Sequence, residues 1–353
     1  MPELPERAAA LLRQHTVGKT IHHVDTFEDK LVFSGITHDD FAHEITGRVV
    51  ENATRYGKCF YIQLRGKGRT PVLHFGMTGM LQVKGHATVQ YKSSAAGSSD
   101  VWPPRFVKFI LYIQDEGPVP GFTEIAFSDA RRLGRIRLVK FPLDEPPISE
   151  LGFDPILSMP SLDDFHASLS KRTCPIKALL LDQSFSAGIG NYLADEILYQ
   201  AGVHPEQRCN TLDSNQVIAL RHHMSDVCHT AVEANADDNK YPEHWLFKHR
   251  WGKGKNTKTT MKLPSGEPVV IKWITVGGRT SAYVPDVQKL ISRRNNPDVP
   301  EVGPTVGDHE AVVAQRRSQR RHESRSSLSM QPGYSKSPSV ASLRRSNRIR
   351  GGA

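Results

Sequence analysis

Cysteine is scarce in this chain: there are 4 cysteines in 353 residues, and no two of them form a Cys-x-x-Cys pair. They are Cys59, Cys174, Cys209 and Cys228. Such wide spacing offers neither a four-cysteine zinc site nor a disulfide framework, so we expect no structural metal. The same scarcity favours a reducing compartment.

Long apolar runs and, toward the end of the chain, acidic residues are also missing. No stretch is long enough to span a membrane or to form a signal-peptide core, so we expect no membrane partner. Residues 311–353 contain nine Arg, one Lys and a single acid, Glu323, and we expect this tail to be disordered. Its basic cluster at 316–321 suits either DNA contact or recognition by import factors, so we expect a nuclear protein.

The rest of the chain is sufficient for two folded domains, and its net charge of +9 favours a polyanionic partner. Residues 2–141 contain short strand patterns separated by turns, which predict a β-sandwich or barrel. Five prolines make 142–160 a linker. Helical periodicity fills 161–250, a β-hairpin is predicted within 265–290, and 291–353 is the basic tail. The predicted fold class is therefore α+β.

Pro2 is the most informative residue, because it becomes the N-terminal residue once the initiator Met is removed. An α-amine has a pKa near 8, against about 10.4 for a lysine, so roughly a tenth of it is neutral at pH 7. A neutral amine can attack an aldehyde-like carbon, and the iminium formed by a secondary amine stays cationic and acts as an electron sink. Glu3 is a candidate proton donor or acceptor. The alternative is an ordinary frayed terminus.

Six motifs in fixed order carry a resemblance to a known family. They are Pro2-Glu3-Leu4-Pro5-Glu6, Tyr56-Gly57-Lys58, His74-Phe75-Gly76-Met77-Thr78-Gly79, Asp129-Ala130-Arg131-Arg132-Leu133-Gly134, the segment from Thr173 to Glu196, and Gly277-Gly278-Arg279-Thr280. With them the chain resembles the formamidopyrimidine-DNA glycosylases, in the plant and fungal branch that lacks zinc. The resemblance implies an N-terminal β-sandwich with an N-terminal helix, a helix–two-turn–helix domain and a zincless hairpin finger.

The resemblance also implies an activity, that of a bifunctional DNA glycosylase and AP lyase of base excision repair. The chain would bind damaged double-stranded DNA as a monomer and excise oxidised purines, namely formamidopyrimidines, further-oxidised guanine products and, as an additional candidate, 8-oxoguanine. Pro2 would form the iminium, Glu3 would move protons, and β,δ-elimination would leave a gap in the strand. This chemistry needs no metal and no nucleotide or redox cofactor.

Loop residues are expected to fill the space that an extruded base leaves in the DNA stack. Met77 and Leu133 are apolar wedge candidates, and Arg131 offers donors to the orphaned partner base. Core packing is the alternative for the two apolar residues. Gly76 and Gly79 bracket Met77, however, which favours a loop tip.

Four residues are predicted to contact the DNA backbone. In the family Lys58, which we place with the catalytic residues, binds the phosphates that flank the lesion, and His74 is another backbone contact; a solvated sheet edge is the alternative for both. Asn191 begins a helix and would present phosphate-binding N–H groups, or it is a simple N-cap. Arg279 at a hairpin tip either reaches a phosphate or is a solvated turn residue.

Glu6, Lys177 and Glu196 are weaker site candidates. Lys177 and Glu196 match positions around the lesion pocket of relatives, although both could equally be charges on the surface of a helix.

The opening run is about two residues shorter than the family's, which continues with Val-Glu where Glu6 is followed directly by Arg7. We expect a helix at 7–14, and two residues of helix correspond to roughly 200° of rotation. Pro2 and Glu3 would then be displaced or turned. We therefore expect this sequence to bind damaged DNA but to cleave it poorly. The alternative function is a non-catalytic or weakly catalytic helix–two-turn–helix DNA-binding protein.

Overall fold

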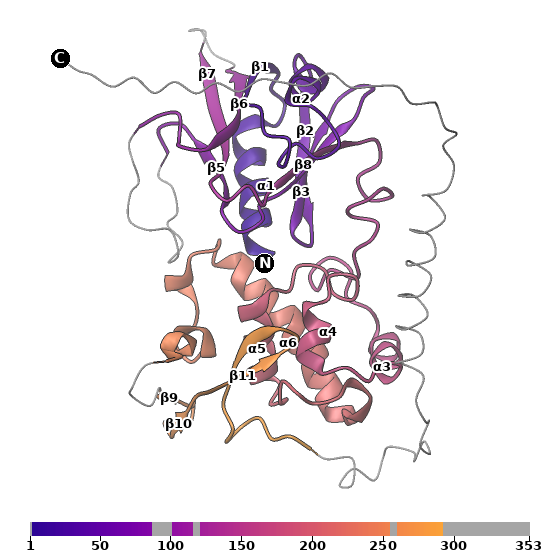
Figure 1. Ribbon diagram of the computed structural model, residues 1–353, viewed down its shortest axis with the longest axis vertical. Helices are drawn as coiled ribbons and strands as arrows, with labels where there is room; N and C mark the ends of the chain where they lie inside the picture. Colours follow the sequence, from indigo (N-terminus) through magenta and orange to yellow (C-terminus); the bar gives the residue numbers. More distant parts are fainter. Residues whose placement is uncertain (1, 87–100, 116–120, 255–259, 292–353) are drawn as a thin grey trace, which may run out of the picture. The chain divides into compact units, whose positions relative to one another are not determined.

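Two antiparallel sheets of four strands each form the N-terminal part of the computed structural model, which describes residues 2–86, 101–115, 121–254 and 260–291 (Figure 1). The strand orders are β1-β6-β7-β5 and β2-β3-β4-β8. The bounds are β1 Ile21–Thr26, β2 Val50–Tyr56, β3 Cys59–Leu64, β4 Thr70–His74, β5 Gly79–Val83, β6 Val107–Gln114, β7 Phe122–Asp129 and β8 Arg135–Val139. The predicted sandwich is thus confirmed.

Helix α1 (Glu3–Thr16) carries the N-terminus and shares one apolar core with both sheets. Its residues Pro5, Ala8, Ala9, Leu12 and Thr16 are buried, at the i, i+3, i+4 and i+7 spacing of a single helix face. The helix is longer at both ends than the predicted 7–14. The buried face continues without a break into the first turn, so the short opening run does not put α1 out of phase with the sheets.

Helix α2 (His38–Ile45) packs against β1 and is the second helix of this domain. A capping box holds its start: the Thr37 hydroxyl accepts the N–H of Asp40, and the Asp40 carboxylate accepts the N–H of Thr37. Its apolar residues Phe41 and Ile45 are buried in the core shared by the sheets and α1.

The predicted linker is fastened by one buried carboxylate. Asp154 accepts hydrogen bonds from the backbone N–H groups of Ile156 and Leu157, and across the chain from the N–H of Gly57 at 2.9 Å. The Arg55 guanidinium donates to the same carboxylate. Asp154 therefore ties this segment to the tip of the β2–β3 hairpin, which consists of Gly57 and Lys58.

Four α-helices build the second domain, as the periodicity predicts. They are α3 Leu162–Ser170, α4 Ile176–Leu181, α5 Asn191–Gln200 and α6 Ser214–Glu233. The short 3₁₀ helix η1 Cys209–Thr211 lies between α5 and α6, and η2 Asp238–Lys240, η3 Leu246–Lys248 and η4 Arg250–Gly252 follow α6. A single apolar cluster unites α3 to α6. Among the described residues no helix is both long and apolar enough to cross a membrane.

The predicted hairpin within 265–290 is present, but the first of its two predicted strands is divided, so that two small sheets form. Strand β9 (Thr260–Lys262) pairs with β10 (Pro268–Val270), and β11 (Lys272–Val276) pairs with β12 (Arg279–Tyr283). The second pair turns through Gly277 and Gly278, whose φ values of +57° and +71° match a type I′ turn. A Cβ on Gly277 would come within 3.0 Å of the Ala178 Cβ, so this tip lies directly against α4.

Of the predicted tail at 291–353, all but residue 291 lies outside the described residues.

Candidate active site

Pro2 lies buried where three segments meet. A Cβ on Gly188, in the turn between α4 and α5, would stand 3.4 Å from the Pro2 Cβ and 3.5 Å from the Gly57 Cα. Gly188 has a φ of +99°, a conformation that L residues rarely adopt. Gly188 thus lies close to both the N-terminal proline and the tip of the β2–β3 hairpin, and the buried Pro2 is not a frayed end.

Glu3 is completely buried and points away from the sheet-facing side of α1. It lies nine residues, or two and a half helical turns, before Leu12, so the two side chains point to opposite sides of the helix. Its Oε1 accepts a hydrogen bond from the Tyr192 hydroxyl of α5 at 2.6 Å, and its Oε2 has no partner among the described residues. The carboxylate next to Pro2 therefore has one hydrogen-bonded oxygen and one buried oxygen that has no partner among the described residues.

Glu6, the weaker carboxylate candidate, is engaged in ion pairs. It lies 2.6 Å from Arg13 of the same helix and 3.2 Å from the buried Arg55 of β2. These contacts hold α1 against the sheet, which is a structural role.

Lys58 stands at the hairpin tip with its ammonium turned inward. Its Nζ donates to the carbonyl of Ile189 at 3.0 Å, which adds a further link between the hairpin and the glycine-rich turn. Burial lowers the pKa of Lys58 to about 8; Glu3 opposes this shift and Arg279 adds to it. The solvated sheet edge considered for this residue is therefore wrong.

His74 ends β4 and accepts the N–H of Gly76 on its Nδ1 at 3.0 Å. Burial, together with the positive charges of Lys58 and two arginines, lowers the pKa of His74 to about 4. The imidazole is therefore neutral at pH 7, and its proton lies on Nε2 because Nδ1 is an acceptor. Such a ring can offer one neutral N–H to a phosphate but no positive charge.

The predicted wedge residues lie on two adjacent loops. Met77 is 70% exposed and Leu133 is 41% exposed, which excludes core packing for both. A Cβ on Gly76 would come within 2.4 Å of the Leu133 backbone, so the two loops pack backbone to backbone. Arg131 is also exposed.

Asp129 fixes the geometry of both wedge loops. Its carboxylate accepts the Thr78 hydroxyl at 2.5 Å from one loop and the N–H groups of Arg131 and Gly134 from the other. Arg132 adopts a φ of +56° and reaches back to Asp29 with two hydrogen bonds. These hydrogen bonds therefore fix the two loops that carry Met77 and Leu133 relative to each other.

Asn191 is the first residue of α5, and its N-cap is Gly190, so the interpretation as an N-cap is wrong. Its side-chain Nδ2 donates to the carbonyl of Thr280 at 3.0 Å, which connects α5 to the hairpin tip. Arg279 begins β12 and is exposed. The start of α5 is therefore hydrogen-bonded to the residue that follows Arg279.

Lys177 and Glu196 are fully buried, so neither is a surface charge. Lys177 pairs with Asp195, which also accepts from Arg250 and from the N–H of Ala282 at 3.2 Å. Glu196 accepts the N–H groups of Leu246 and Phe247 and the side chain of Gln200. Burial raises the pKa of Glu196 to about 7. Both residues support the framework that carries α5 and β12.

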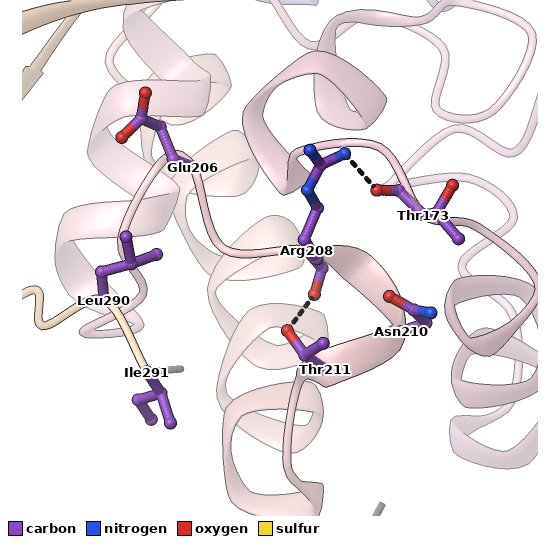
Figure 2. Close-up of a pocket in the computed structure, with 7 residues that line it drawn as sticks. All are labelled: Thr173, Glu206, Arg208, Asn210, Thr211, Leu290 and Ile291. Carbon is purple, nitrogen blue, oxygen red and sulfur yellow. Dashed lines mark hydrogen bonds between the residues drawn. The ribbon is translucent and has the colours of Figure 1, made fainter. Parts of the chain in front are cut away.

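The structure brings together two cysteines that lie far apart in the sequence: the Sγ atoms of Cys174 and Cys209 are 3.9 Å apart, both as free thiols. A surface pocket of about 460 Å³ is lined by residues that adjoin these cysteines in the sequence (Figure 2). It is lined by Thr173, Glu206, Arg208, Asn210, Thr211, Leu290 and Ile291, none of which is a predicted site residue. Within the described residues no group of three His, Cys, Asp or Glu side chains could hold a metal ion.

Sequence reasoning missed the residues that position the site. Asp129, Asp154 and Asp195 are buried carboxylates that fasten loops to one another, and Tyr192 holds Glu3. Asp129, Tyr192 and Asp195 lie within the motifs of the family resemblance, so the sequence indicates that their segments matter. Their distant partners lie 18 to 189 positions away in the sequence, and spacing does not reveal such pairs.

Comparison with known proteins agrees with this architecture. A family model of the formamidopyrimidine-DNA glycosylase N-terminal domain matches residues 1–136, and one of the H2TH domain of these enzymes matches residues 151–242. The formamidopyrimidine-DNA glycosylase of Arabidopsis thaliana is 39% identical over 295 residues, which cover 83% of this chain and 72% of that protein. The protein of the same name from Desulforamulus reducens is 31% identical over 308 residues, or 82% and 99%.

Solved structures have the same fold. The Lactococcus lactis formamidopyrimidine-DNA glycosylase, bound non-covalently to DNA that contains an AP site, aligns with a TM-score of 0.63 and 21% identity over 81% of this chain and 98% of that one. The same bacterial enzyme in complex with DNA containing Fapy-dG gives a TM-score of 0.62 and 20% identity, over 82% and 99%. By its domains and its relatives, this chain belongs to the formamidopyrimidine-DNA glycosylase family.

Proposed function

We propose that the chain is a bifunctional DNA glycosylase and AP lyase that excises oxidised purines from double-stranded DNA. One observation carries the proposal: Pro2 is buried against Gly188, which also lies against Gly57 of the hairpin that carries Lys58, and the buried Glu3 carboxylate is next to Pro2 in the chain. A removable Met leaves Pro2 with a secondary amine at this point. An amine supplies the nucleophile and a neighbouring carboxylate supplies the proton-transfer group that iminium chemistry requires.

The reaction begins with the Pro2 nitrogen attacking C1′ of the damaged nucleotide. A C1′–N bond forms and the bond to the base breaks, with the electron pair leaving on the base. The amine proton passes to Glu3 as the C1′–N bond forms, and the sugar ring opens as Glu3 gives this proton to the ring oxygen, which leaves an iminium. Loss of a C2′ proton expels the 3′ phosphate, and a second elimination expels the 5′ phosphate. Water then releases the sugar remnant and regenerates the amine.

The substrates proposed are formamidopyrimidines, further-oxidised guanine products and, as an additional candidate, 8-oxoguanine. Solved relatives support DNA with lesions as the ligand, since they are complexes with AP-site DNA and Fapy-dG DNA. Met77, Leu133 and Arg131 would fill the vacated space, while Lys58, His74, Asn191 and Arg279 would hold the backbone. Water is the only further reactant in this scheme.

The alternative, a DNA-binding protein without catalysis, depends on the short run after Glu6. The continuous buried face of α1 argues against it, as do the contacts of Glu3 with Tyr192 and of Pro2 with Gly188. We also propose a monomer located in the nucleus, on the strength of the basic cluster at 316–321.

Borohydride trapping tests the proposed function. The full chain, with its initiator Met removed, is incubated with a duplex that contains one abasic site, and sodium borohydride reduces any iminium to a stable covalent complex. We expect efficient trapping of the wild-type protein and severe loss in Pro2→Gly. Equal trapping by Pro2→Gly would show that another amine reacts, and binding without any trapping or strand cleavage would favour the non-catalytic alternative.

A further inference from the structure

We infer that Tyr192 and Tyr241 form a chain of two hydroxyls that positions Glu3, so that Tyr192 is a positioning residue for the proton transfers of the reaction. This inference depends on the proposed function, since it assigns a role to the carboxylate that serves it.

The three groups come from distant segments and make consecutive contacts. The Tyr192 hydroxyl lies 2.6 Å from Glu3 Oε1, and it lies 2.9 Å from the Tyr241 hydroxyl. A phenol has one proton to donate. Because the proton of Tyr192 goes to the carboxylate, the hydrogen bond between the two hydroxyls runs from Tyr241 to Tyr192. Both O–H groups therefore point toward Glu3.

Aromatic packing holds this chain in place. Tyr192 is 4% exposed and Tyr241 is 2% exposed. The Phe247 ring lies 4.8 Å from the Tyr192 ring and 5.1 Å from the Tyr241 ring, and Trp245 stands 5.0 Å from Tyr241. Such contacts restrict both phenols to one rotamer. A short hydrogen bond from a hydroxyl to a carboxylate, shielded from water, is among the strong ones.

The consequence concerns which oxygen of Glu3 carries the exchangeable proton. Oε1 accepts from Tyr192, whereas Oε2 is buried and has no partner among the described residues. A proton that Glu3 gives or takes is thereby directed to Oε2. Without the Tyr192 hydroxyl the carboxylate can rotate, and the two oxygens become equivalent. Misplacement of a reacting group by about 1 Å is enough to slow catalysis on the order of a hundredfold.

Tyr192→Phe tests the inference, with Tyr199→Phe as the matched control. Tyr199 is on the same helix and equally buried, but it belongs to a different apolar cluster. We expect Tyr192→Phe to lower the single-turnover cleavage rate on an abasic duplex between about tenfold and a hundredfold, which corresponds to one hydrogen bond to a charged group. Affinity for a duplex with a tetrahydrofuran site should match that of Tyr199→Phe. Tyr241→Phe should give a smaller loss.

A double-mutant cycle separates positioning of Glu3 from a general structural role. In the Glu3→Gln background, Tyr192→Phe should cause no further loss, because it acts through Glu3. A second readout needs no turnover: the ¹³C resonance of the labelled Glu3 carboxyl should shift in Tyr192→Phe and stay in place in Tyr199→Phe.

The outcomes are distinguishable. A wild-type rate in Tyr192→Phe, an additive loss in the Glu3→Gln background, or an unmoved ¹³C resonance would overturn the inference while leaving the proposed function intact. Failure of the wild-type protein to cleave would overturn both.

Discussion

Gly188 packs against Pro2: a Cβ added to Gly188 would stand 3.4 Å from the Pro2 Cβ. Its left-handed φ of +99° shapes the turn that precedes α5. A residue of the helical domain thus forms one wall around the N-terminus of the sandwich domain.

Gly188→Ala should therefore impair catalysis as well as stability. The left-handed backbone costs a non-glycine residue about 1–3 kcal/mol, and relaxation of the turn would move the wall beside Pro2. Gly266→Ala is the matched control, because Gly266 has a φ of +87° and nothing within 4 Å of an added Cβ. We expect both variants to lose similar thermal stability. Only Gly188→Ala should lower the single-turnover cleavage rate, by about tenfold or more, because a sub-ångström misplacement of the reacting group is enough for a loss of this order. Equal rates in the two variants would argue against close packing of Gly188 on Pro2.

DNA affinity should depend on the protonation of Lys58. Its pKa of about 8 in the free protein rises when a phosphate binds, because the charged form is favoured. Below the free value both states are charged and affinity is constant; as pH rises above about 8, binding must take up a proton and affinity falls. Titration of a tetrahydrofuran duplex from pH 6.5 to 9.5 should show this decline in wild type and a flatter profile in Lys58→Arg. The same decline in both proteins would assign it to another group.

Arg279 should contribute one phosphate contact. Arg279→Ala is expected to weaken DNA binding and to lower the slope of log K against log salt by about one unit. Lys272→Ala controls for the loss of a charge, since Lys272 lies at the other end of the same hairpin, opposite Tyr283. Chelators should leave wild-type affinity unchanged. Stoichiometric zinc that is needed for folding would contradict this account of the hairpin.

For insertion of Val-Glu between Glu6 and Arg7, the sequence and the structure predict opposite changes in the cleavage rate. The short opening run predicts that the insertion restores activity. The continuous buried face of α1 predicts that it turns Pro2 and Glu3 by roughly 200° and moves them by roughly 3 Å, which should lower the cleavage rate at least about a hundredfold. The same insertion in the Gly66–Gly68 turn serves as a control. A gain in single-turnover rate after Glu6 would favour the first expectation.

The fold was largely predictable because its signals are local. Alternation marked the strands, periodicity marked α4 to α6, and two adjacent glycines marked the tip before Arg279. The full length of α1 was not predicted, because its start depends on burial of Pro5 and Ala8 against sheets formed later in the chain. The division of residues 260–283 into two sheets likewise depends on pairing with β9, which lies before the predicted hairpin.

Within the site, the residues that touch DNA in the proposed function were predictable and those that hold them were not. Met77, Arg131 and Leu133 occupy loops whose composition marks them as exposed. The burial of Lys177 and Glu196 and the contact between Tyr192 and Glu3 are set by tertiary packing across 189 positions or fewer. Charge type alone does not distinguish a surface residue from a buried, paired one.

The identity of the atom that attacks the sugar is the central claim, and mapping the trapped adduct tests it most directly. The wild-type protein is reduced with borohydride on an abasic duplex, digested with nuclease and protease, and sequenced by tandem mass spectrometry. We predict that the mature N-terminal peptide carries the sugar remnant on the nitrogen of Pro2 and that the Lys58 peptide is unmodified. A remnant on Lys58 or on any other lysine, with Pro2 unmodified, would contradict the account.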